Sequence, residues 1–229
     1  MIRDRILGRR ATKIFLGNQG AAQYLPQEKL VFSGNPINRS AVLETTGLDL
    51  ARLGLQKKKP VLLILGGSQG SLAINNALLP VVPKLAGADI QLLWQAGEKS
   101  CHDITTKLKG LAGVHVFAYT HEIGRYYNSA DFVLARAGAL TLAELEVKKL
   151  PALLIPLPSA AGNHQYFNAL EMKKKGLALL LNQSEVTPES LREHLLELAA
   201  SAENMRRNFQ PSPHLHAARM IAENIMRRI

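Results

Sequence analysis

The sequence predicts an α/β fold with a Rossmann-like parallel sheet of six strands and helices on both faces. Short apolar segments recur along the chain, and a segment of helical length separates each one from the next. The expected strands are 61–65, 90–94, 114–118, 132–135, 152–156 and 177–181. Strands that alternate with helices form a parallel sheet, because each helix carries the chain back across one face. Right-handed crossovers then place the loops that follow the strands at one edge of the sheet.

The composition agrees with a globular fold and narrows its setting. Hydrophobic residues make up 47% of the 229-residue chain, which is enough for a large core. A single cysteine, Cys101, excludes an internal disulfide and fits a reducing compartment. No apolar run approaches the roughly 20 residues that span a bilayer. Charges interrupt the apolar part of the N-terminus, so it does not resemble a secretory signal.

The net charge is +10, from 28 basic and 18 acidic residues, and the basic residues gather near both ends. An anionic membrane surface, an anionic substrate or nucleic acid would each explain this charge. Aromatic residues make up only 5% and are not interleaved with the basic ones, as a stacking surface for single-stranded nucleic acid would require. We therefore expect no nucleic-acid partner.

The remaining elements can be placed in chain order. Residues 1–29 are basic, begin in a helix-like way and hold no complete α/β unit, while 29–32 is a short strand that leads into a Gly-Asn-Pro turn. Thr187 and Pro188 mark a helix start, as N-cap and first helical residue. The last helix is amphipathic. The expected helices are 41–55, 72–86, 102–110, 122–129, 139–149, 164–175, 188–200 and 215–229.

The stretch 136–144, RAGALTLAE, follows the expected strand 132–135 and opens a helix through Gly138. A helix that starts at the carboxyl end of a parallel strand directs free N–H groups at a ligand there. Glu144 adds a carboxylate near the helix start, so an anion with sugar hydroxyls would suit this corner. The alternative is an ordinary corner whose arginine and glutamate are solvated.

Two other loops share this edge of the sheet. The glycine-rich loop 66–71 permits close approach of a phosphate, with a hydroxyl from Ser68, but it lacks the lysine of a P-loop and the dinucleotide-binding spacing. A tight structural turn is the alternative there. The loop 158–165 leads into a helix that carries Gln165 and Asn168, whose amides match paired sugar hydroxyls. Helix capping by the preceding asparagine, with a solvated glutamine, is the alternative.

Other candidate residues give weaker evidence for a functional site. The loop 119–122 is placed where its backbone could hydrogen-bond the edge of a planar base. Cys101 and His102 are neighbours at a helix start and rarely face each other, which argues against a nucleophile pair. His214 and His216 lack further ligands, and no Asp-x-Asp element follows any strand, so we expect neither a metal nor a cofactor.

Four motifs together resemble one family: GNP at Gly34, GGSQGS at Gly66, RAGALTLAE at Arg136 and HQYFNAL at His164. Their order and spacing are similar to those of the bacterial peptidoglycan N-acetylglucosaminyltransferases, the MurG family of the GT-B class. That family transfers N-acetylglucosamine from its UDP conjugate to undecaprenyl-pyrophosphoryl-N-acetylmuramyl pentapeptide, converting lipid I to lipid II. The resemblance implies the C-terminal half of a GT-B glycosyltransferase.

The resemblance also implies roles for individual residues. Ser68 would bond the donor phosphates, Thr120 would meet uracil through its backbone, and Glu144 would hold the ribose hydroxyls. Gln165 would recognise the N-acetylglucosamine ring. Ala139, Leu140 and Thr141 would line the diphosphate at the helix start, and Leu142 and Ala143 would be further substrate-binding residues. Further candidates for donor contact are Arg136, His164 and Asn168.

The chain departs from the family in two ways. Asn38 stands where the family has an arginine after the GNP run, so that donor contact is assigned to Arg39. The family's GGTGGH and HEQN motifs are absent; they belong to the N-terminal domain that binds the lipid acceptor and is expected to hold the catalytic residues. The chain thus divides into 1–40, a remnant of that domain with the inter-domain joint; 41–210, the UDP-sugar domain; and 211–229, a helix that would pack on the missing domain.

The expected function is the donor side of lipid II synthesis, in cell wall biogenesis, cell shape and cell division, with little or no transfer by this chain alone. Lipid I would bind through a missing or separate N-terminal half. Basic charge suits peripheral attachment to the cytoplasmic face of the inner membrane. Two alternatives stay open: the donor subunit of a split transferase with a membrane partner, and an inactive nucleotide-sugar-binding fragment. The sequence equally leaves open a natural truncation and a frameshifted gene.

Overall fold

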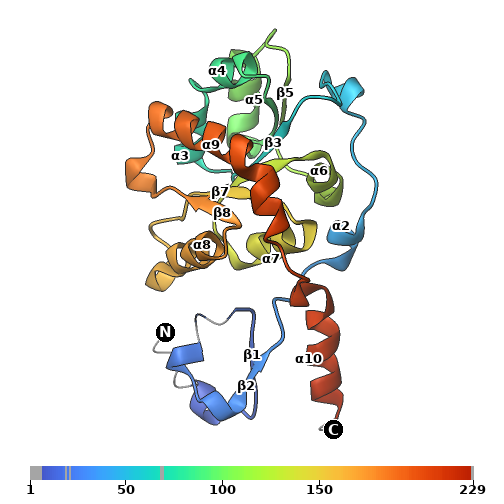
Figure 1. Cartoon of the computed structure of the whole chain (residues 1–229), viewed down its shortest axis with the longest axis vertical. Helices are drawn as coiled ribbons and strands as arrows, with labels where there is room; N and C mark the ends of the chain where they lie inside the picture. Colours follow the sequence, from blue (N-terminus) through green and yellow to red (C-terminus); the bar gives the residue numbers. More distant parts are fainter. Residues whose placement is uncertain (1–6, 19, 21, 68–69, 228–229) are drawn as a thin grey trace.

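The computed structural model describes residues 7–18, 20, 22–67 and 70–227, and its larger part is a six-stranded parallel sheet between helical layers (Figure 1). The strands are β3 (Val61–Leu65), β4 (Gln91–Gln95), β5 (Val114–Phe117), β6 (Phe132–Ala135), β7 (Ala152–Leu154) and β8 (Ala178–Leu180). They lie in the order β5-β4-β3-β6-β7-β8. This is the Rossmann order, so the predicted fold class is confirmed, and each predicted strand is present to within two residues at either end.

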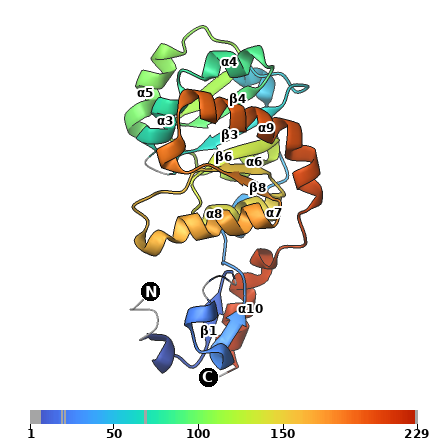
Figure 2. The same ribbon diagram turned by 60° about the vertical axis from the view of Figure 1, so that its left-hand side comes forward.

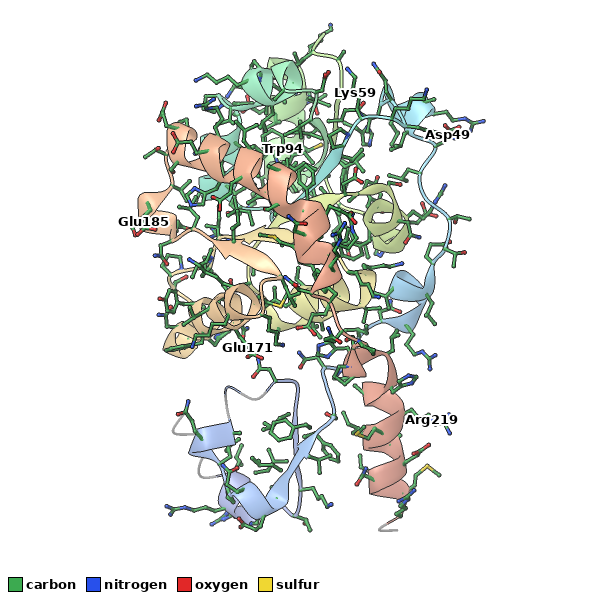
Figure 3. All side chains as sticks on the ribbon, in the orientation of Figure 1. Asp49, Lys59, Trp94, Glu171, Glu185 and Arg219 are labelled. Carbon is green, nitrogen blue, oxygen red and sulfur yellow. The ribbon has the colours of Figure 1, made fainter. Side chains whose placement is uncertain are left out.

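Alternate residues of each strand enter opposite cores, as strand geometry requires. Leu63 and Leu65 pack with α6 (Ile123–Ser129), α7 (Ala139–Lys148) and α8 (His164–Lys174). Leu62 and Ile64 pack on the other face. The helices of that second layer are α3 (Leu72–Leu78), α4 (Val82–Gly87), α5 (Glu98–Lys107) and α9 (Pro188–Arg207) (Figure 2). Trp94 lies within this second layer, labelled in Figure 3, and donates its indole N–H to the Asn75 side chain at 3.1 Å.

The order of the strands reverses between β3 and β6, which are hydrogen-bonded neighbours. From β3 the chain proceeds to one side of the sheet, through β4 and β5, and from β6 to the other side. Ligands of open α/β sheets bind outside the carboxyl ends of the strands at such a switch point. The glycine-rich loop 66–71 and the start of α7 both lie at this point.

Two expected helices are interrupted in the structure, and the helix expected over 102–110 is instead α5, Glu98–Lys107. The segment 72–86 forms two helices, α3 and α4, because Pro80 cannot continue α3 and Pro83 lies in the first turn of a new helix. The segment 41–55 forms a short α2 (Arg39–Leu43), an extended stretch, and a 3-10 helix η3 (Leu50–Leu53). Its extended stretch is held by other elements: Asn128 of α6 donates to the carbonyls of Glu44 and Thr46.

The end of the chain follows the expectation more closely. Thr187 caps α9 and Pro188 is its first residue, but α9 continues to Arg207. The expected terminal helix begins as a 3-10 turn, η6 (Pro213–His216), and continues as α10 (Ala217–Met226). Two other 3-10 turns follow strands of the sheet, η4 (Ala161–Asn163) and η5 (Gln183–Glu185). Among the described residues, no helix has the combination of length and apolar character that crossing a membrane requires.

A small second unit lies below the sheet in Figure 1, beside α10. It contains β1 (Ile14–Leu16), which was not predicted, and the expected β2 (Leu30–Phe32), with two 3-10 turns, η1 (Ala22–Tyr24) and η2 (Gln27–Lys29), between them. The two strands are parallel, and the Leu16 carbonyl accepts from the N–H groups of Ser33 and Gly34, each at 3.1 Å. We call this segment, 14–32, the β1–β2 unit.

Candidate functional site

The start of α7 presents free N–H groups at the switch point. Gly138 is the N-cap, with extended backbone angles and no side chain to cap the helix. The first intrahelical bond runs from the Leu142 N–H to the Gly138 carbonyl at 3.0 Å. Helix geometry therefore leaves the N–H groups of the first turn, those of Ala139, Leu140 and Thr141 among them, without helical acceptors. Together with the helix dipole, they form a place where an anion is stabilised.

Glu144 lies one turn further along α7 and is fixed by Tyr127 of α6. The Tyr127 hydroxyl donates to Glu144 Oε2 at 2.7 Å. Burial raises the pKa of the Glu144 carboxyl, and the bond from Tyr127 opposes that rise. Burial and the nearby carboxylate raise the pKa of Tyr127 well above its ordinary value, so Tyr127 remains a donor. The carboxylate is thus partly buried and held by Tyr127 through one of its oxygens, whereas the alternative interpretation of this corner supposed a fully solvated side chain.

The loop after β7 orients Gln165 from the first turn of α8. The Gln165 Oε1 atom accepts from the Leu157 N–H at 3.0 Å, which leaves the amide NH₂ as the end available for donation. Asn163 is the N-cap of α8 but has left-handed backbone angles and makes no side-chain capping bond, so the capping alternative is not realised. His164 is exposed, and its Nδ1–H donates to the Ala161 carbonyl at 2.8 Å.

Arg136 is half-buried at the end of β6, and its guanidinium donates hydrogen bonds to three loops. Nη1 donates to the carbonyls of Ile155 and Pro156, at 3.0 and 3.2 Å. Nη2 donates to Ser71 Oγ at 2.8 Å and to Gln183 Oε1 at 2.6 Å. Burial lowers the pKa of Arg136. The guanidinium therefore braces neighbouring loops, and it is not solvated.

The glycine-rich loop is shaped by close packing against the loop after β4. Gly70 has φ +74°, and a Cβ there would clash with the backbone, because it would lie only 2.2 Å from the Ala96 carbonyl oxygen. Ser71 ends the loop as the N-cap of α3, and its hydroxyl accepts from the Ile74 N–H at 3.4 Å. The tight-turn explanation thus accounts for Gly70. Ser68 lies outside the described residues.

The other predicted residues are spread around this edge. Thr120 follows β5, and its hydroxyl accepts from the Glu122 N–H at 3.0 Å. Arg39 is exposed and opens α2, which packs on α6 and α7. The side chains of Leu142 and Ala143 are only 7% and 1% exposed, so they contribute mainly by packing α7.

Two asparagine side chains hydrogen-bond the backbone at the start of α7, and a third holds one of them. Asn168 donates to the Ala137 carbonyl at 3.1 Å and accepts from Asn18 of the β1–β2 unit, also at 3.1 Å. Asn35, in the Gly-Asn-Pro turn, donates to the Ala139 carbonyl at 3.3 Å. Both terminal groups of the Asn168 amide are therefore engaged with protein.

A cavity of about 290 Å³ separates α7 and α8 from the β1–β2 unit. Of the predicted site residues, it is lined by Ala139, Leu142, Ala143 and Asn168, whereas Glu144 lies on the other side of α7. Glu171, labelled in Figure 3, lies on the side of α8 that faces this unit. The buried His214 closes the cavity: its Nδ1 accepts from the Asn35 N–H at 2.8 Å and its Nε2 lies 3.5 Å from Glu146 Oε2.

Several of these contacts had no signal in the sequence. Three of the partners, Tyr127, Gln183 and Asn18, hydrogen-bond to residues that are distant along the chain, and no sequence motif surrounds them. Asn35 belonged to a motif, but only as a turn residue. Within the described ranges, no three His, Cys, Asp or Glu side chains come close enough together to hold a metal ion.

The Rossmann strand order, with an uncapped helix start and a fixed carboxylate at the switch point, defines an α/β domain of the class that binds ligands outside the carboxyl ends of its strands. The model of the glycosyltransferase family 28 C-terminal domain matches residues 61–225. The chain therefore belongs to glycosyltransferase family 28, of which it contains the C-terminal domain.

Curated relatives carry the name UDP-N-acetylglucosamine--N-acetylmuramyl-(pentapeptide) pyrophosphoryl-undecaprenol N-acetylglucosamine transferase. The one from Bacillus pumilus is 34% identical over 207 residues, covering 89% of this chain and 57% of the relative. The one from Chlorobaculum tepidum is 33% identical over 229 residues, covering 98% of this chain and 62% of the relative. The chain thus spans a little over half the length of these relatives.

Solved structures agree on the fold. The crystal structure of Acinetobacter baumannii MurG superposes with a TM-score of 0.64 at 26% identity, covering 85% of this chain and 58% of the other. A complex of S. aureus MnaA with UDP gives a TM-score of 0.71 at 14% identity, covering 96% and 61%. The second likeness shows the fold alone.

Proposed function

We propose that this chain binds UDP-N-acetylglucosamine and supplies the donor site for transfer of N-acetylglucosamine to lipid I, which forms lipid II. The observation that carries this proposal is the uncapped start of α7 followed, one turn later, by a carboxylate that Tyr127 holds in place. This arrangement offers donors to a diphosphate and acceptors to a ribose within one helix. The names of the curated relatives supply the sugar and the acceptor.

The proposed contacts follow the polarity of each group. The N–H groups at Ala139, Leu140 and Thr141 face the diphosphate, with Ser68 and Arg39 as further donors. The Glu144 Oε1 atom accepts from the ribose hydroxyls, and the backbone at Thr120 meets uracil. The Gln165 NH₂ group donates to a hydroxyl of the N-acetylglucosamine ring, beside His164.

The contribution of this domain to the transfer reaction is mainly electrostatic. In an inverting transfer, an acceptor hydroxyl attacks the anomeric carbon as the bond from that carbon to the phosphate oxygen breaks, and UDP leaves. Negative charge develops on the diphosphate, where the N–H groups of α7 stabilise it without having to reorganise. The base that takes the proton of the hydroxyl, and the site for the lipid, would belong to the half of the relatives that this chain does not span.

The same proposal assigns roles to the ends of the chain. Residues 1–40 are the edge of that other half with the joint, 41–210 are the donor domain, and 211–229 pack on the other half. The positive charge near both ends would attach the protein peripherally to the anionic cytoplasmic membrane face. Vesicles with anionic lipid should therefore bind the chain weakly, and less as salt is raised; binding that ignores salt would contradict this attachment.

A chimaera tests the transfer activity. The N-terminal half of the Bacillus pumilus relative is joined to this chain, and the formation of lipid II from UDP-N-acetylglucosamine and lipid I is followed by chromatography. We expect transfer by the chimaera, little or none by this chain alone, and loss of transfer in a chimaera with Glu144→Gln. A folded chimaera that binds the donor and transfers nothing would refute the activity and favour an inactive nucleotide-sugar-binding fragment. Transfer when the N-terminal half is added as a separate chain would indicate a split enzyme.

A further inference from the structure

The guanidinium of Arg136 connects the carboxyl ends of four strands. Arg136 itself follows β6. Its acceptors are Ser71, at the end of the loop after β3, the carbonyls of Ile155 and Pro156 after β7, and Gln183, the first residue of η5 after β8. In the sheet, β6 lies between β3 and β7, and β8 lies beyond β7. One side chain thus bridges both sides of the switch point.

These acceptors account for the hydrogen-bonding capacity of the guanidinium ends. The two terminal nitrogens carry four N–H groups, and four acceptors lie at 2.6 to 3.2 Å from them. An Arg136 that contacted a diphosphate would have to give up some of these bonds. The planar fork of arginine is suited to such fixed, multiple contacts, whereas the single ammonium of lysine is not.

Two of the three loops that Arg136 joins are those with proposed donor contacts. Ser71 closes the glycine-rich loop 66–71, which contains Ser68, a proposed phosphate contact. The Ile155 and Pro156 carbonyls begin the loop that leads to Gln165, and the next N–H of that loop, from Leu157, holds the Gln165 amide at 3.0 Å. Fixing these two points fixes the distance between the loops.

We propose that Arg136, with Gln183 as its partner, is a positioning residue. It sets the spacing between the glycine-rich loop 66–71 and the loop 157–165, which leads to Gln165, and it does not itself contact the donor. This inference rests on the proposed function, since it concerns the same site. It concerns the β-phosphate and the sugar and leaves the uridine contacts at Thr120 and Glu144 unaffected.

Two variants and a matched control test the proposal by calorimetry. Arg136→Lys keeps the charge but loses the fork, and Gln183→Ala removes one acceptor without touching the proposed site. Arg206→Lys is the control, because Arg206 donates to the Asp131 carbonyl at 2.7 Å, at the opposite end of β6. The probes are UDP-N-acetylglucosamine and UMP, which lacks the β-phosphate and the sugar.

Positioning predicts that Arg136→Lys and Gln183→Ala each weaken UDP-N-acetylglucosamine binding, by about tenfold for Arg136→Lys, and change UMP binding by less than about twofold. Arg206→Lys should change neither. A parallel loss for both probes would overturn the proposal, because general destabilisation acts on all ligands. Unchanged or tighter donor binding by Gln183→Ala would also overturn it, since releasing Arg136 would help a direct contact.

A measurement without ligand separates this inference from the proposed function. Hydrogen–deuterium exchange of the free chain is compared between wild type and Gln183→Ala, the milder variant. Faster exchange confined to peptides that cover 66–71 and 157–165 supports the brace even if the wild type binds no donor. Unchanged exchange in both loops, or an increase spread over the whole domain, contradicts it.

Discussion

Two carboxylates on α7 allow binding and stability to be separated. Glu144 accepts from Tyr127, and burial raises its pKa despite that bond. The folded state therefore favours the neutral carboxyl, and keeping Glu144 ionised at neutral pH lowers the free energy of unfolding. Glu144→Gln removes the charge and leaves a carbonyl oxygen to accept from Tyr127. We expect its melting temperature to equal or exceed that of the wild type.

Donor binding should respond in the opposite direction. In the proposed site, the carboxylate accepts from ribose hydroxyls, and hydrogen bonds to a charged group contribute about 1.5 to 3 kcal/mol. Losing that contribution raises the Kd for UDP-N-acetylglucosamine by about 10- to 150-fold. Isothermal calorimetry measures this Kd, and differential scanning calorimetry measures the melting temperature of the same samples.

Glu146 provides the matched control two residues further along the helix. Burial acts to raise its pKa, but hydrogen bonds and charges from His214 and Lys175 outweigh burial and lower it. Its ionised form therefore stabilises the fold, and this contribution is lost as the pH falls through the lowered pKa. Glu146→Gln should destabilise the protein by about 1 kcal/mol, which is about 2 to 4 °C in melting temperature. The Kd should change by less than about twofold.

The pH dependence gives a second check. Affinity for UDP-N-acetylglucosamine should fall as the pH is lowered through the raised pKa of Glu144, while the affinity of Glu144→Gln stays level. The sugar diphosphate is used because the terminal phosphate of UDP would itself titrate near pH 6. The reasoning is refuted if Glu144→Gln melts as early as Glu146→Gln and binds the donor like the wild type.

Two further variants test how the site is built. Tyr127→Phe removes the bond that opposes the rise in the Glu144 pKa, so donor affinity should be half lost at a higher pH than in the wild type; an unshifted midpoint in calorimetry would contradict this. Gly70→Ala is compared with Gly54→Ala, because both glycines have φ +74° but only Gly70 would bring a Cβ to 2.2 Å from the Ala96 carbonyl oxygen. Gly54→Ala should lose about 1 kcal/mol in urea unfolding, because alanine is strained at positive φ. Gly70→Ala should lose more than this and should also weaken donor binding; equal losses would count against the packing explanation.

The strands were predictable from the sequence because their signal is local. Each is a short, mainly apolar run between helix-length segments, and all residues of β3, β4, β6 and β7 are buried. β1 gave no such signal, since it has only three residues, of which Leu16 alone is buried, and it pairs with β2. The helix expected over 41–55 failed for another reason: side chains of α6 bind the carbonyls that a helix would have used.

In the candidate site, too, local features were predictable from the sequence and tertiary contacts were not. The start of α7 was predictable, because one glycine after a buried strand marks where the helix begins. The orientation of Glu144 was not, since Tyr127 lies 17 residues away and no motif links them. The four acceptors of Arg136 belong to three separate loops, so its engagement with protein depends on the tertiary fold.

Direct binding of UDP-N-acetylglucosamine to this chain tests the central claim, that the donor site is contained in the C-terminal domain. Calorimetry is run on folded protein, once with EDTA and once with magnesium. We predict binding in both conditions, with a Kd that Glu144→Gln raises and Glu146→Gln leaves in place. A folded sample that binds neither UDP-N-acetylglucosamine nor UDP, or that binds only with magnesium, would contradict a site in which the N–H groups of α7 neutralise the diphosphate.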